Sequence, residues 1–248
     1  GISGTDGRIY VENSPLLSLT ELEQVKFSTA NAIQLISGEL VPNAIAQSGN
    51  ANIRFMTGIT VNGTWSPALS SGATNTTYTF TPSANHANIN PTDIDLILRI
   101  RYSHATINTA CVSCSQSGII NVNTPIETWN DQGPVFNKTL TINAISEANI
   151  LSPIALRYAT DAYGDKGVLS FYLNTAGNIY VNAAINTNIP LSRSSTIPLT
   201  DGGSVYLNST AGSVFVNAAI NTSGAVSTTN ASSNSGVGGT ISITGAGG

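Results

Sequence analysis

Short runs in which apolar and polar residues alternate recur throughout the C-terminal third of the chain. The segments FYLN, IYVN, VYLN and VFVN end at Asn174, Asn182, Asn208 and Asn217, and ISIT, ending at Thr244, has the same pattern. A period of two is typical of a β-strand with one buried face. Asn, Ser, Thr, Ala and Gly fill the intervals and favour tight corners. The pattern therefore predicts short strands at regular spacing.

A longer phrase repeats around these strands. NTAGNIYVNAAINTN at 174–188 returns as STAGSVFVNAAINTS at 209–223, 35 positions later. A β-solenoid needs such repetition, because each coil must turn at the same place for its strands to stack in register. The Ala and Ile residues would fill an interior corner, and the Asn residues would form ladders between coils. Two β-hairpins are the alternative, since YLNSTAGSVFV also fits a hairpin loop of four or five residues.

The region 38–152 also has a β pattern, interrupted by Pro and Gly. Its clearest strand is expected in DIDLILRIRYS at 93–103, where apolar residues alternate with Asp93, Asp95, Arg99 and Arg101. This region fits either a β-sandwich or an irregular stretch of solenoid.

One helix is predicted, at 21–36. Thr20 and Glu23 form a capping box, and apolar residues follow at helical spacing. We expect three regions: a strand and this amphipathic helix at 1–37, a β-rich region at 38–152, and a repeat-containing β region at 153–248. The predicted fold class is all-β with one short N-terminal helix and a β-solenoid-like (parallel β-helix) C-terminal part. A hairpin-rich β-sandwich throughout is the alternative.

The segments GGSVYLNSTAGSVFVNAAINTSG and GGTISITGAGG carry a family resemblance. They resemble the repeat region of filamentous haemagglutinin-type secreted exoproteins, whose coils read roughly Gly-Gly-x-Ile-x-Leu-Asn-Ala-Gly-Gly-x-Ile-x-Val-Asn. The resemblance covers about residues 167–248. It implies a secreted right-handed parallel β-helix with an adhesive or structural role. The predicted N-terminal helix and the charged segment at Asp93 depart from that family.

The composition favours association of the chain with itself. Charged residues make up 9% of the chain, against about 25% in typical domains, and none occurs in 202–248. A net charge of −4 gives weak mutual repulsion. Uncharged strands without Pro are prone to pair with other chains, so we expect their edges to be covered by neighbouring coils or by another subunit.

The same composition limits the partners and the location. The nine Lys and Arg residues form no cluster, which argues against binding to nucleic acid. The sequence contains no run of 18 apolar residues, so no membrane-spanning helix is predicted. The hydroxyl-rich composition and the paired cysteines indicate an extracellular or cell-surface protein. The start at Gly1, without Met, fits a processed mature protein or a fragment.

Cys111 and Cys114 are candidates for a disulfide, within one chain or between chains. Zinc held by these two residues with His86 and His104 is the alternative, because the four supply two sulfurs and two nitrogens. Our prediction is no metal site and no cofactor. Asp161 and Asp165 lack the spacing of a dedicated calcium loop and are interpreted as acids in a turn.

A carbohydrate-acting enzyme would need carboxylates along one strip of a β-helix. Asp93 and Asp95 are the candidates, and we interpret them instead as part of a solvated strand face. We therefore expect no enzymatic activity. The function predicted is an extracellular structural protein that forms a filament, sheath or adhesive fibre. A fragment of a haemagglutinin-like adhesin that binds glycans is the alternative, and a polysaccharide-acting enzyme is a third reading.

Two short segments are candidates for strand exchange between subunits. One is GRIYVEN, with Ile9 and Val11, and the other is GTISIT, with Ile241 and Ile243. Asn-X-Ser/Thr sequons permit glycosylation but occur about as often as chance predicts. They lie at Asn62, Asn75, Asn137, Asn208, Asn221 and Asn230.

Overall fold

A computed structural model describes residues 49–57, 61–99, 103–130, 137–158, 168–188, 201–224 and 236–246, together with three short strands nearer the N-terminus. The chain forms two compact units, 1–48 and 49–248. In the first unit, β1 (Ile9–Val11) pairs in parallel with β2 (Ile33–Leu35), and β2 pairs antiparallel with β3 (Leu40–Val41).

The prediction of a helix at 21–36 is wrong over its last turn. Residues 33–35 form the strand β2, while the remainder of the predicted helix lies outside the described residues. Ile33 and Leu35 alternate with Gln34, and this pattern suits a strand as well as a helix end.

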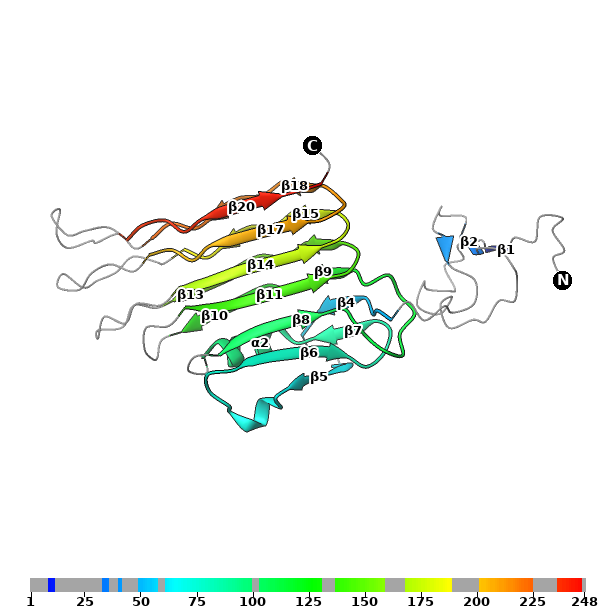
Figure 1. The fold of residues 1–248 in the computed structure, drawn as a ribbon, viewed down its shortest axis with the longest axis horizontal. Coiled ribbons are helices and arrows are strands. Elements are labelled where there is room, and N and C mark those ends of the chain that lie inside the picture. The colour runs from blue at the N-terminus through cyan, green and yellow to red at the C-terminus, as the bar shows by residue number, and fades with distance from the viewer. Residues whose placement is uncertain are drawn as a thin grey trace. The chain divides into compact units, whose positions relative to one another are not determined.

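The second unit is a parallel β-solenoid, as the repeats predicted (Figure 1). Each full coil contributes one strand to each of three sheets. The coils are formed, in chain order, by β8 (His104–Asn108), β9 (Ile120–Val122) and β10 (Ile126–Asn130); β11 (Lys138–Ala144), β12 (Ala148–Ile150) and β13 (Ile154–Tyr158); β14 (Leu169–Thr175), β15 (Ile179–Val181) and β16 (Ile185–Asn186); and β17 (Val205–Ser209), β18 (Val214–Val216) and β19 (Ile220–Asn221). The strand β20 (Ile241–Thr244) begins a further coil.

Successive strands along the chain lie in different sheets. The orders are β20-β17-β14-β11-β8-β6-β5, β18-β15-β12-β9-β4-β7 and β10-β13-β16-β19. Neighbours within a sheet come from successive coils and are in register, so that Ile179 lies opposite Val214 and Ile185 opposite Ile220. The strands in YLNSTAGSVFV therefore do not pair with each other, which excludes the hairpin and sandwich alternatives for the described coils.

The corners of the coils differ in how much chain they use. From β11 onward, the corner between the second and third strands of a coil is always three residues long, at 151–153, 182–184 and 217–219. The connection from the third strand of one coil to the first strand of the next varies widely in length. It spans 131–137, 159–168, 187–204 and 222–240.

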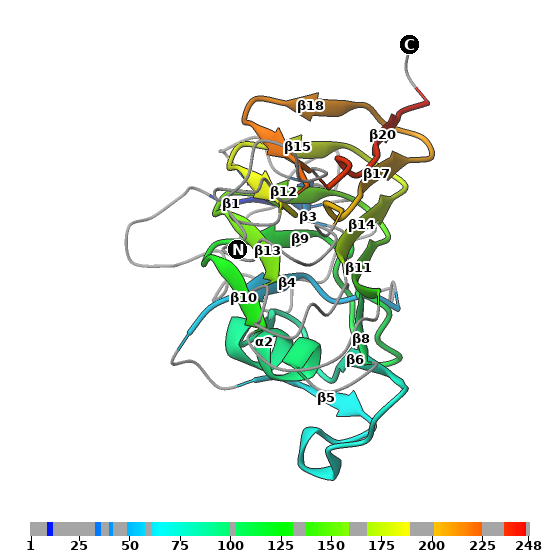
Figure 2. The ribbon, with the colours of Figure 1, turned by 90° about the vertical axis from the view of Figure 1, so that its left-hand side faces the viewer.

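The first coil closes the N-terminal end of the solenoid. It consists of β6 (Thr77–Pro82), β7 (Ala87–Ile89) and the helix α2 (Pro91–Arg99) on the third face. Figure 2 shows α2 below β10, against which it packs. The strand β5 (Gly63–Ser66) pairs antiparallel with β6, and a 3₁₀ turn (Leu69–Ser71) follows it. The strand β4 (Ile53–Phe55) is inserted between β7 and β9.

The prediction of a strand at 93–103 is wrong over 93–99, because 91–99 form this helix. The apolar residues also fit a helical face, and Ile94, Ile97 and Leu98 are buried at the spacing i, i+3, i+4. Pro91 begins the helix. This position suits proline, because an N–H group in the first turn has no partner within the helix and its absence removes no hydrogen bond. Asp95 and Arg99 form an i,i+4 ion pair at 2.9 Å.

The core fills the interior of the solenoid with aliphatic columns. Ile53, Ile120, Ala148 and Ile179 follow one another across four neighbouring strands, and all are fully buried. The described residues contain no helix of the length and apolarity needed to cross a membrane.

Candidate assembly edge

The C-terminal edge of the solenoid exposes residues that belong to its interior. The strands β20, β18 and β19 are the last of their sheets among the described residues. Val216 is 40% exposed, and Ile241 and Ile243 are 45% and 48% exposed. Their partners one coil below, Val181, Val205 and Leu207, are at most 1% exposed. These side chains are exposed because no described strand lies over them.

Aromatic rings continue the stacking on the outer surface of the sheets. Tyr180 and Phe215 stack with ring centroids 4.9 Å apart and planes 7° from parallel. Tyr172 and Tyr206 stack in the same way at 4.5 Å. Phe215 is 43% exposed at the end of its column. The edge therefore offers an aromatic ring as well as aliphatic side chains.

Amide ladders bind the coils to one another, as the sequence predicted. Asn143 Nδ2 donates to Asn108 Oδ1 at 2.8 Å, and Asn174 Nδ2 donates to Asn143 Oδ1 at 2.9 Å. At the edge, Asn217 Nδ2 donates to Asn182 Oδ1 at 2.8 Å. Each amide can donate to one coil and accept from the next, so the ladder can extend from coil to coil.

Glycines set the close approach of successive coils at the corners. A Cβ on Gly212 would lie 2.5 Å from the carbonyl carbon of Gly177, which occupies the same corner one coil below. The Ala246 N–H donates to Gly212 O at 3.0 Å, so the chain returns to this corner after β20.

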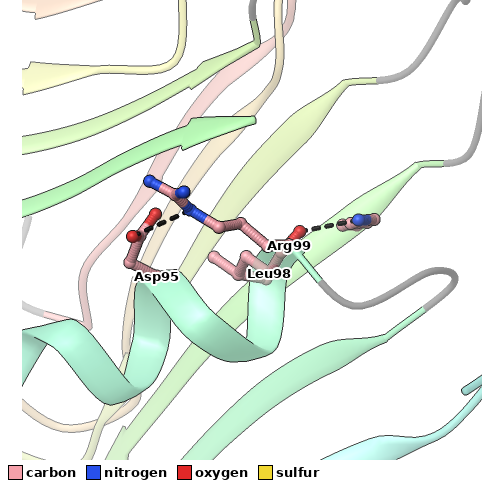
Figure 3. Close-up of polar contacts among 4 residues, drawn as sticks. Asp95, Leu98 and Arg99 are labelled. Carbon is pink, nitrogen blue, oxygen red and sulfur yellow. Dashed lines mark hydrogen bonds and ion pairs between the residues drawn. The ribbon is translucent and has the colours of Figure 1, made fainter. Parts of the chain in front are cut away.

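The N-terminal end of the solenoid, in contrast, is closed by internal contacts. Trp65 Nε1 donates to Asp93 Oδ2 at 3.2 Å and joins β5 to α2. Burial raises the pKa of the Asp93 carboxyl, and the hydrogen bond from Trp65 offsets part of this shift. Asp95 pairs with Arg99 on the same helix (Figure 3). The two carboxylates thus have separate structural partners.

A buried lysine supports the same helix from a neighbouring strand. Lys138 is 2% exposed, and its Nζ donates to Leu98 O at 2.6 Å near the C-terminal end of α2 (Figure 3). Burial lowers the Lys138 pKa to about 8. Sequence reasoning missed this residue, although Lys138 shares the inward-facing alternation of Leu140 and Ile142, which was a readable signal.

The cysteines lie in the long corner between β8 and β9. Cys111 and Cys114 are joined in a disulfide within the chain. The loop that it closes pairs with the segment leading into β4: Cys111 N donates to Gly49 O at 2.7 Å, and Gly49 N donates to Cys114 O at 3.1 Å. The disulfide loop therefore helps to hold the inserted strand β4 in place.

The structure does not bring the four residues of the zinc alternative together. His86 lies beside Gln116, whose Nε2 is 2.9 Å from His86 Nε2. His104 Nδ1 is 3.0 Å from Thr139 Oγ1, and burial lowers the His104 pKa, with a further contribution from the charge of Lys138. Across the described ranges, no three His, Cys, Asp or Glu residues are placed to hold a metal ion. Asp161 and Asp165 lie outside those ranges.

The remaining candidates fall in different environments. Asn75 and Asn137 are exposed, whereas Asn62, Asn208 and Asn221 are half-buried, and Asn230 lies outside the described residues.

Ile9 and Val11 lie in β1, and Ile241 and Ile243 lie in β20, already paired with β17. An open groove of about 310 Å³ runs along the corner between the first and second strands of the coils, and its lining residues include Asn108, Asn143 and Asn174.

Comparison of the chain with protein-family models, with curated proteins and with solved structures finds no match.

Proposed function

We propose that this protein is a non-enzymatic structural protein of the cell surface that assembles end to end into a filament by β-strand addition. The observation that carries the proposal is the asymmetry of the solenoid. Its N-terminal end is covered by α2 and β5, while interior residues such as Val216, Ile241 and Ile243 are exposed at its C-terminal edge. A protein strand added to that edge buries these residues and pairs the backbone groups of the last coil.

The side surfaces of the solenoid also suit a structural role. Ladders of Asn and stacked rings tie each coil to the next, and the faces carry few charges. Asp93 and Asp95, the candidate catalytic pair, are engaged with Trp65 and Arg99 in supporting the first coil. An extracellular location is part of the proposal, and the disulfide between Cys111 and Cys114 supports it.

Electron microscopy of negatively stained protein over a range of concentrations tests this function. We expect unbranched filaments whose length grows with concentration, because a contact between unlike surfaces leaves one free copy of each surface at the two ends of the growing assembly. The variant Val216→Lys places a charge on the open edge and should give monomers with an unchanged circular dichroism spectrum. Leu151→Lys is the matched control, since Leu151 is 48% exposed away from that edge. Monodisperse monomer at every concentration of the wild type would contradict the proposal.

A second candidate function is glycan binding by a haemagglutinin-like adhesin. The groove lined by Asn108, Asn143 and Asn174 favours it, because neutral amides are hydrogen-bonding partners for sugar hydroxyls. A glycan array probed with wild type and with the groove variant Ala110→Trp distinguishes this candidate, because Ala110 lines the groove and is exposed. Binding that Ala110→Trp removes, in protein that stays monomeric, would favour the adhesin over the filament.

A further inference from the structure

The strand β1 and the edge strand β18 share a sequence pattern. GRIYV at 7–11 corresponds to GSVFV at 212–216 and to GNIYV at 177–181, one coil below the edge. The shared features are the glycine, two aliphatic residues and the aromatic residue between them. Arg8 and Glu12 stand where the coils have uncharged residues, so the correspondence is confined to the glycine and the three strand positions.

The strand β1 is already paired in the manner of a solenoid strand. It runs parallel to β2 in one-to-one register, with Ile9 opposite Ile33 and Val11 opposite Leu35. The same parallel one-to-one pairing joins β18 to β15. In the order β1-β2-β3, β1 is the outer strand, and none of the described strands of its unit pairs with its other edge. That edge can accept a parallel partner without loss of the pairing to β2.

Placing β1 on β18 extends the columns of the six-stranded sheet without a break. The interior columns become Ile179, Val214, Ile9, Ile33 and Val181, Val216, Val11, Leu35, aliphatic at every position. The outer column becomes Tyr180, Phe215, Tyr10, Gln34. A shift by one residue would place Tyr10 over an interior valine, and a shift by two would leave a single residue pair between these three-residue strands, so the unshifted register keeps every column.

We infer that β1 of one molecule adds in parallel to β18 of the next, with Tyr10 opposite Phe215 and Ile9 opposite Val214. The inference rests on the proposed end-to-end assembly and names the two surfaces that form it. At the closed N-terminal end of the solenoid, β5 runs antiparallel to its neighbour, α2 occupies the third face, and the outer parallel strand β7 is already buried along Ala87–Ile89.

Cysteine cross-linking between two variants tests the register directly. Cys111 and Cys114 are the only cysteines of the chain, and their disulfide leaves an introduced cysteine as the reactive thiol. Directly opposed residues of paired strands have Cα atoms within the range of a disulfide. Tyr10→Cys protein mixed with Phe215→Cys protein should give a heterodimer on mild oxidation. Tyr10→Cys mixed with the control Leu151→Cys should give about tenfold less, because that pair meets only by diffusion.

The remaining outcomes separate this inference from the function on which it rests. Wild-type filaments without the Tyr10–Phe215 cross-link would overturn the inference and leave the proposed function intact. A link between two Phe215→Cys molecules, or an intramolecular link in Tyr10→Cys/Phe215→Cys protein at high dilution, would overturn it too. Absence of wild-type filaments would overturn both. Val11→Lys provides an independent check: it should abolish filaments, because the lysine would lie over Val216 in the interior column. The thermal transition of the solenoid should stay unchanged, because β1 belongs to the compact unit 1–48.

Discussion

Lys138 on β11 and Leu98 on α2 are joined by a hydrogen bond of 2.6 Å from the lysine Nζ to the backbone carbonyl oxygen. Carbonyl groups in the last turn of a helix lack partners within the helix. A side chain from another coil therefore satisfies the end of α2, and it does so with a buried amine whose pKa is lowered to about 8.

This pair predicts a specific pH dependence of stability. Between pH 8 and the ordinary lysine value of 10.5, the unfolded chain binds more protons at Lys138 than the folded chain does. The contribution of Lys138 to the free energy of unfolding should therefore rise with pH across this window, by about 1–2 kcal/mol. Urea unfolding of wild type and of Lys138→Met at pH 7 and pH 10 measures the difference. Equal pH dependence in the two proteins would contradict the assignment.

The corner glycines predict a contrast between two substitutions. A Cβ on Gly203 would collide with the carbonyl oxygen of Leu169 one coil below, whereas a Cβ on Gly238 meets its nearest atom, Thr222 O, at 3.6 Å. Gly203→Ala should lower the free energy of unfolding by about 2 kcal/mol or more, because the coils must separate. Gly238→Ala should change it by less than about 0.5 kcal/mol. Similar losses from the two variants would show that close packing of the coils is not the cause.

The amide ladder predicts the effect of an isosteric change. Asn143→Asp removes the donor to Asn108 and places two acceptor oxygens together. We expect a loss of about 1–3 kcal/mol at neutral pH, recovered in part when acid protonates the new carboxyl. The control Asn217→Asp, at the exposed end of another ladder, should lose less than about 1 kcal/mol. Chemical unfolding at pH 7 and pH 4 measures both, and a loss from Asn143→Asp that does not depend on pH would be inconsistent with a ladder.

The disulfide predicts a role in anchoring the inserted strand. Cys111→Ser/Cys114→Ser should lower the free energy of unfolding by about 2 kcal/mol, the chain-entropy value for so short a loop. Amide hydrogen exchange should increase at 49–53, since Gly49 is bonded to both cysteines through the backbone. Reduction of the wild type should reproduce both effects. Exchange that rises only elsewhere would separate the disulfide from β4.

The solenoid could be predicted from the sequence because the same strand pattern and corner glycines recur in successive coils. Each of the segments at 171–174, 179–182, 205–208 and 214–217 carries the alternation of a strand, and Gly177 and Gly212 recur at equivalent corners. At these positions the alternation that predicts each strand and the repetition that predicts stacking of the coils indicate the same structure. Asn ladders follow from the same repetition.

The helix at 91–99 could not be recognised by alternation alone. Ile94, Leu96 and Leu98 satisfy a period of two, while Ile94, Ile97 and Leu98 satisfy the helical period, and burial selects the second set. Pro91, with Asp93 in the first turn, was the signal that distinguishes them. The open edge is different in kind. It follows from which strands are last in their sheets, and a sequence of repeats does not contain that information.

The connection from the third strand of one coil to the first strand of the next varies in length, and this has a consequence for where the sequence can change. The first strands of successive coils stay in register although the connection that leads from one coil to the next varies in length, from 131–137 at its shortest to 222–240 at its longest. Insertions are tolerated where the added backbone need not join the sheets. New sequence can therefore accumulate between the third strand of one coil and the first strand of the next, and a tag or foreign epitope inserted between β16 and β17 should leave the pairing of β14 with β17 intact.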